Sequence, residues 1–107
     1  MNEEISATEL KYLLDSGKDL LVVDVREDDE LAKARFENAL HVRMAQVPDR
    51  ISELQPKDQD IVVLCHLGSR SGRVAAFLRE SGFTNVANLA GGIDAWSREV
   101  DPKVPTY

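Results

Sequence analysis

The sequence predicts an α/β domain built around a mainly parallel sheet. Apolar segments with strand character and segments with helical periodicity alternate four times along the chain, with short connections between them. The strand segments, of which 61–64 is the most apolar, carry apolar side chains on both faces, as parallel strands buried between helices do. A length of 107 residues supplies one hydrophobic core, so we expect a single domain over 1–107 with its core at about 5–100.

Local signals place the first helix and set the order of the elements that follow. Ser6 and Glu9 have the spacing of a capping box, a stripe of leucines follows at helical spacing, and Gly17 supplies the stop. Residues 20–25 are rich in β-branched side chains and predict a buried strand. The remaining expected elements are, in chain order, a weak helical turn at 31–34, a short strand at 40–42, a helix at 46–54, a strand at 61–64, a helix from about 71 to 80, a strand at 86–89 and a helix at 93–100 before an irregular tail at 101–107.

Composition and charge exclude several classes of protein. The formal net charge is −6, from 13 basic and 19 acidic residues, and this disfavours binding to nucleic acid or to anionic lipid. The longest apolar runs, at 20–23 and 61–65, are far shorter than the roughly 20 residues that cross a bilayer, and no secretory signal is recognisable. We therefore expect a cytoplasmic protein with no membrane partner, as a monomer or weak homodimer. Its single cysteine cannot form an intramolecular disulfide.

The 65–71 loop has the composition of a ligand-binding segment. It joins the most apolar strand to the start of a helix, and open α/β sheets bind ligands beyond the carboxyl ends of their strands. Gly68 permits the positive φ that a tight turn of converging N–H groups needs, and Ser69 and Ser71 can cap the helix. Such a concavity attracts negative charge. The expected substrate-binding residues are therefore His66, Leu67, Gly68, Ser69, Arg70 and Ser71.

Cys65 is the expected catalytic residue. Its sulfur would lie at the rim of the loop, under the positive end of the helix dipole and near Arg70, and both influences favour the thiolate. An ordinary cysteine with a pKa of about 8.5 is only ~3% ionised at pH 7, so a lowered pKa would create a competent nucleophile. The alternative, a small apolar plug at the end of a strand, does not account for the glycine, serines and arginines that follow. We expect the side chain of His66 to face solvent, and we retain Arg73 as a secondary candidate.

Three motifs together resemble the rhodanese-like single-domain sulfurtransferases. They are the 65–71 loop, Asp-Val-Arg-Glu at 24–27 and Asn-Leu-Ala-Gly-Gly-Ile-Asp-Ala-Trp at 88–96. The resemblance implies a five-stranded, mainly parallel sheet with helices on both faces. It also implies that Cys65 accepts a sulfane sulfur, that the backbone N–H groups of 66–71 hold the persulfide, and that the Arg70 side chain recruits an anionic donor.

The same resemblance separates structural residues from one atypical segment. By analogy Asp24, Arg26 and Glu27 form polar pairs near the sheet edge, and Trp96 packs the final helix. At 34–39 the chain reads Ala-Arg-Phe-Glu-Asn-Ala, where the family usually has Gly-His-Ile-Pro-Gly-Ala. Loss of both glycines and the proline changes the turn chemistry, so we expect this connection to be built differently.

The resemblance leads to a two-step exchange as the expected reaction. Cys65 attacks the outer sulfur of a small donor, of which the thiosulfate anion is the simplest, and becomes a persulfide. The sulfur then passes to an external acceptor, such as cyanide or a small or protein thiol, because the chain has no second cysteine to resolve it. No metal or other cofactor is expected, since one cysteine with His41 and His66 does not form a ligand set.

Two other functions stay open at this point. Cysteine-dependent phosphatases and arsenate reductases use a similar loop with five residues between cysteine and arginine. Here four residues separate Cys65 from Arg70, and the smaller cradle fits one sulfur atom better than a phosphoryl group. A non-catalytic interaction module could reuse the same fold, although degenerate copies are expected to lose the cysteine first.

Overall fold

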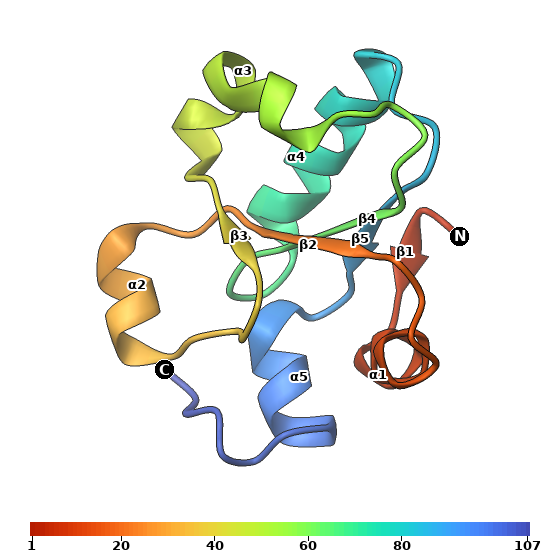
Figure 1. Ribbon diagram of the computed structural model, residues 1–107. Coiled ribbons are helices and arrows are strands. Elements are labelled where there is room, and N and C mark those ends of the chain that lie inside the picture. The colour runs from red at the N-terminus through yellow and green to blue at the C-terminus, as the bar shows by residue number, and fades with distance from the viewer.

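The computed structural model describes all residues from 1 to 107 and contains one five-stranded sheet with helices on both faces (Figure 1). The strands are β1 (Glu4–Ile5), β2 (Leu21–Asp24), β3 (Leu40–His41), β4 (Ile61–Leu64) and β5 (Val86–Leu89). The helices are α1 (Ala7–Asp15), α2 (Asp28–Lys33), α3 (Val47–Arg50), α4 (Ser69–Glu80) and α5 (Gly92–Glu99), with 3₁₀ turns η1 (Met44–Gln46) and η2 (Ile51–Leu54). The strand order is β1-β5-β4-β2-β3 and every neighbouring pair is parallel, which confirms the predicted fold class.

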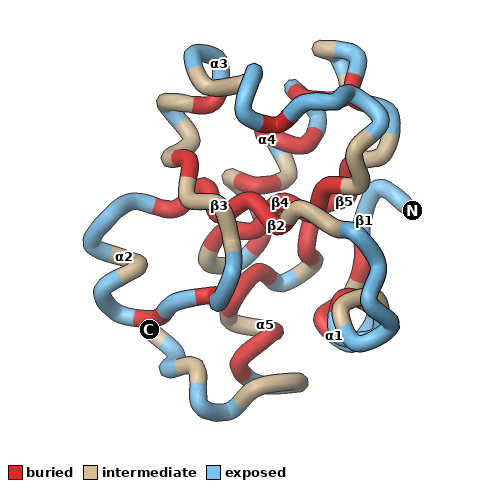
Figure 2. Tube along the Cα trace, in the orientation of Figure 1, coloured by how far each residue is buried: buried red, intermediate tan, exposed pale blue.

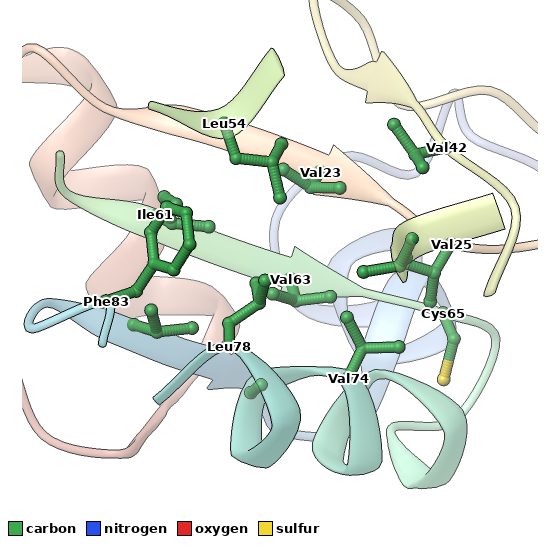
Figure 3. Packing of buried hydrophobic residues seen from close by; sticks show 13 residues of the cluster. Val23, Val25, Val42, Leu54, Ile61, Val63, Cys65, Val74, Leu78 and Phe83 are labelled. Carbon is green, nitrogen blue, oxygen red and sulfur yellow. The ribbon is translucent and has the colours of Figure 1, made fainter. Parts of the chain in front are cut away.

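The central strand β4 divides the core into two halves. All of its side chains are buried, and they alternate between the two faces because successive residues of a strand point in opposite directions. Ile61 and Val63 pack with α4, while Val62 and Leu64 pack with α1 and α5. Figure 3 shows the first of these halves, and Figure 2 shows buried residues gathered along the middle strands. This arrangement holds the carboxyl end of β4 rigidly on both sides.

The helix predictions from local sequence succeeded to different degrees. Helix α1 has the expected capping box, because the Ser6 side chain accepts from the Glu9 N–H and the Glu9 side chain accepts from the Ser6 N–H. The single helix expected at 46–54 was wrong, since this stretch is split into η1, α3 and η2. Pro48 lies at the start of α3 and has no N–H to donate to the preceding turn, so η1 and α3 do not form one continuous α-helix. None of the helices combines the length and apolar character needed to cross a bilayer.

The atypical 34–39 segment keeps a tight turn without glycine. Asn38 adopts a φ of 62°, the left-handed conformation that asparagine tolerates better than most residues. Phe36 is buried and its ring centroid lies 4.7 Å from that of Trp96 on α5. Trp96 is therefore structural, as expected, and the altered segment is fastened to the final helix through an aromatic pair.

A buried ion pair anchors the chain where it leaves β2. Arg26 is 0% exposed and its guanidinium donates to the carboxylate of Asp24, at 2.6 Å for the shortest contact. Glu27, the third polar residue of this motif, is the N-cap of α2 and faces Arg43 at the surface. After α5, the irregular 101–107 segment turns back across the molecule and ends beside α2 (Figure 1).

Candidate active site

The 65–71 loop lies at the carboxyl end of β4, between the strand and α4. Figure 3 shows the sulfur of Cys65 beside the first turn of α4. The helix begins at Ser69, two residues before the predicted start, and its N-cap is Gly68, with a φ of 111°. The predicted serine caps were wrong, because Gly68 reverses the chain in a left-handed conformation that serine would strain to adopt. This reversal turns the amides of the loop inward.

Hydrogen-bond donors converge on the sulfur of Cys65. The Gly68 N–H donates to Sγ at 3.1 Å and the Ser71 hydroxyl lies 3.3 Å from it. Burial raises the pKa of the Cys65 thiol, but the Ser71 hydroxyl and the N–H groups of Ser71, Gly68 and Leu67 outweigh that effect, so the pKa lies below its ordinary value. The loop therefore favours the thiolate, the reactive form of cysteine.

Ser71 is held in place by Asn88, a residue to which the sequence analysis gave no role. The Asn88 side-chain amide donates to the Gly68 carbonyl at 3.0 Å, and its oxygen accepts from the Ser71 hydroxyl. That hydroxyl has one hydrogen, so Asn88, the Gly68 carbonyl and Cys65 compete for it, and a charged sulfur is the strongest acceptor of the three. Asn88 is a polar side chain within the apolar strand β5, which is the sequence signal that could have revealed it.

The N-terminus of α5 fixes the backbone of the loop from the opposite side. The Ile93 N–H donates to the Cys65 carbonyl at 2.9 Å, and the Asp94 N–H donates to the His66 carbonyl at 3.2 Å. Gly92, with a φ of 61°, permits this approach, because a Cβ there would lie only 2.3 Å from the His66 carbonyl oxygen. Gly92 is thus part of the site, because it lets the first turn of α5 approach the loop backbone.

Arg70 does not stand free at the loop but pairs with Glu30 of α2. Its two terminal nitrogens donate to the two oxygens of Glu30 at 2.6 and 2.9 Å. These hydrogen bonds lower the pKa of Glu30 to about 2. The same bonds raise the pKa of Arg70, to which the nearby charge of Cys65 adds a smaller contribution. Nothing in the sequence signalled this pairing, since 40 positions separate the partners.

The other predicted site residues lie at partly or fully exposed positions. His66 is only partly exposed, where a solvent-facing side chain was expected: its ring stacks on that of Tyr107, with centroids 3.9 Å apart, and its Nε2 is buried without a hydrogen-bond partner. Leu67 is 61% exposed and Ser69 is also exposed, so both side chains lie at the surface of the loop. Arg73 is exposed and forms no ion pair.

The sulfur is more enclosed than the sequence suggested. Cys65 was expected at the rim of the loop, yet the residue is only 1% exposed because Val25 and Val74 pack against it in the core (Figure 3). No cluster of three or more histidine, cysteine or acidic side chains is arranged to hold a metal ion. The site therefore presents one enclosed thiol that is surrounded by hydrogen-bond donors.

Comparison with known proteins agrees with this geometry. Residues 6–99 match the family model of the rhodanese-like domain. A sulfurtransferase of Allochromatium vinosum is 40% identical over 104 residues, covering 97% of this chain and 96% of the relative, and YtwF of Bacillus subtilis is 40% identical over 101 residues, covering 94% and 96%. The crystal structure of a rhodanese-like domain protein from Staphylococcus aureus superposes with a TM-score of 0.84 at 30% identity, covering 98% of each chain. The chain belongs to the rhodanese-like domain family.

Proposed function

We propose that this protein is a sulfurtransferase that carries a sulfane sulfur on Cys65. One observation carries the proposal: hydroxyl and amide donors converge on a single thiol whose pKa they lower. Donors in this arrangement stabilise negative charge on the attacking sulfur, and they would do the same for a persulfide that forms on it. The sulfurtransferase named among the relatives, matching over nearly the whole of both chains, supports the same reaction class.

The first step takes sulfur from a small anionic donor such as thiosulfate. The Cys65 thiolate attacks the outer sulfur of the donor and forms an S–S bond. The bond between the two donor sulfurs breaks, and its electron pair leaves with sulfite. The products are the Cys65 persulfide anion and the sulfite dianion, so charge is conserved. The lowered pKa of Cys65 favours this step, because it raises the fraction of the thiol that is present as the attacking thiolate.

The second step passes the outer sulfur to an acceptor that comes from solution. Cyanide attacks the outer sulfur of the persulfide, the S–S bond breaks, and the products are thiocyanate and the Cys65 thiolate. A thiolate acceptor becomes a persulfide in the same way. The chain has only one cysteine, so it cannot resolve its own persulfide as an intramolecular disulfide. A reducing compartment such as the cytoplasm would keep the thiol free between turnovers.

Enclosure of the sulfur limits the donors that fit. Cys65 is 1% exposed, so a donor must present a slender terminal sulfur to the loop. Thiosulfate does so, whereas a bulky disulfide places large groups on both sides of the sulfur under attack. We therefore expect thiosulfate to form the persulfide and bulky aromatic disulfides to react slowly with the folded protein.

Incubation with thiosulfate tests the proposal directly. The intact protein should gain the mass of one sulfur atom, and added cyanide should remove it and release thiocyanate. Cys65→Ser should fold normally and do neither, because serine has nearly the same size but is a far weaker nucleophile. An aryl phosphate serves as the alternative substrate. Hydrolysis of that ester without any sulfur adduct would overturn the proposal, as would a sulfur adduct that persists in Cys65→Ser.

A further inference from the structure

Tyr107 packs against the 65–71 loop, although it takes no part in the sulfur chemistry described above. Its ring lies parallel to that of His66, with an interplanar angle of 10° and centroids 3.9 Å apart. Its hydroxyl accepts from an Arg26 terminal nitrogen at 3.1 Å and donates to Glu30 at 2.8 Å. A residue of the irregular 101–107 segment thus touches the site through both its ring and its hydroxyl.

The Tyr107 hydroxyl connects the buried side chain of Arg26 to the Glu30–Arg70 ion pair at the loop. Arg26 is completely buried and held by Asp24, so its guanidinium is a fixed donor. Tyr107 occupies the position between that donor and Glu30. Glu30 in turn binds both terminal nitrogens of Arg70. A continuous chain of hydrogen bonds therefore runs from Arg26 through the Tyr107 hydroxyl and the Glu30 carboxylate to Arg70.

Hydrogen bonding by Tyr107 affects the charge balance at the loop as well as its geometry. Glu30 opposes the positive charge of Arg70, and the tyrosine hydroxyl takes up part of the hydrogen-bonding capacity of that carboxylate. Without the hydroxyl, one Glu30 oxygen loses a donor, and the carboxylate is held only by Arg70 and by the Glu27 N–H, which donates to its other oxygen at 3.1 Å, so its orientation is less strictly fixed. Both changes would make the field at the sulfur less favourable to an incoming anion.

We propose that Tyr107 is a positioning residue that fixes the Glu30–Arg70 pair and thereby sets how strongly the loop selects anionic over neutral reagents. The proposal rests on the proposed sulfur transfer for its substrate. It concerns the charge presented at Cys65, however, which can be measured without any turnover.

Alkylation of the single cysteine by iodoacetate and by iodoacetamide tests this independently of sulfur transfer. In both reactions the Cys65 thiolate displaces iodide from carbon, and the two reagents differ in charge rather than in chemistry. The ratio of the two rates reports the field at the sulfur and cancels changes in thiolate fraction. Tyr107→Phe keeps the ring over His66 and removes only the hydroxyl. Tyr12→Phe, at an exposed tyrosine on α1, is the matched control.

We expect Tyr107→Phe to lower the iodoacetate to iodoacetamide rate ratio roughly threefold to tenfold, which corresponds to losing one hydrogen bond of ordinary strength. Its KM for thiosulfate should rise by a similar factor while kcat changes little. Tyr12→Phe should alter neither quantity. A rate ratio in Tyr107→Phe equal to that of the wild type overturns the proposal. The proposal is also overturned if KM for thiosulfate rises and kcat falls by similar factors in Tyr107→Phe, because a general loosening of the fold would produce that result. If the wild type transfers no sulfur, the proposed function fails, and the alkylation ratio still decides the role of Tyr107.

Discussion

Replacing Gly92 by alanine tests how strictly α5 holds the 65–71 loop. A Cβ at this position would lie 2.3 Å from the His66 carbonyl oxygen and 2.6 Å from that of Cys65. Both are backbone atoms that accept hydrogen bonds from the first turn of α5, so they cannot rotate away from the new methyl group. Either the loop or the helix must move, and the loop carries the sulfur.

Gly17→Ala provides a matched control for the size of this effect. Gly17 also has a positive φ, of 77°, but nothing lies within 4 Å of a Cβ built there. Each alanine costs about 1–2 kcal/mol for its left-handed conformation. Only the substitution at Gly92 adds overpacking, which costs about 1–3 kcal/mol. We therefore expect the free energy of unfolding to fall by about 1–2 kcal/mol in Gly17→Ala and by about 2–5 kcal/mol in Gly92→Ala.

Urea unfolding, monitored through the fluorescence of Trp96, measures the loss in free energy of unfolding in each variant. Mass spectrometry after a timed exposure to thiosulfate measures persulfide formation. Persulfide formation should be roughly tenfold slower or worse in Gly92→Ala, because a shifted loop no longer directs its N–H groups at the sulfur. In Gly17→Ala it should be unchanged. Equal losses of stability in the two variants, with normal persulfide formation in Gly92→Ala, would refute the reasoning.

Three further substitutions probe hydrogen bonds and ion pairs around the loop. Ser71→Ala removes a donor that lowers the pKa of Cys65, so the ultraviolet titration of the thiolate should move to higher pH; an unmoved midpoint contradicts this role. The pKa of Glu30 is about 2 in the folded protein, against an ordinary 4.5. Its pairing with Arg70 therefore stabilises the fold fully at pH values above 4.5, and this stabilisation is lost as the pH falls toward 2. The contribution is at most about 3 kcal/mol, and Glu30→Gln should flatten the acid limb of the stability curve measured by urea unfolding. Arg26→Ala leaves a buried carboxylate without its partner and should cost about 3–5 kcal/mol, and a loss below about 1 kcal/mol would show that water replaces the guanidinium.

Features encoded by neighbouring residues were predictable from the sequence. The capping box at the start of α1 needs only Ser6 and Glu9, and the strand β4 needs only its own apolar run. The position of Cys65 follows from that strand, since the next residue must emerge at the carboxyl edge of the sheet. The same local reasoning failed for the helix cap, because serine and glycine both begin helices and only the backbone conformation at Gly68 decides between them.

Features that depend on distant parts of the chain were not predictable. Strand β1 is two residues long, too short to produce a pattern, and it exists because it pairs with the edge of β5. The partner of Arg70 lies 40 positions away, and the residue stacked on His66 belongs to a segment with no regular structure. The atypical 34–39 segment suggested a rebuilt connection, yet Asn38 supplies the left-handed turn that a glycine would have given. Composition shows that a turn is altered but does not show which residue compensates.

The orientation of the donors around the sulfur follows from what happens to the carbonyl groups of the same peptides. In a short loop, N–H groups can point inward only if the carbonyls point outward, and a buried carbonyl needs a donor of its own. The first turn of α5 supplies those donors to Cys65 and His66, and the Asn88 amide supplies one to Gly68. The motif at 88–96 is therefore the outer half of the site. It satisfies the carbonyls that face away from the sulfur, and in doing so it leaves the loop amides free to bind the charge that develops on Cys65.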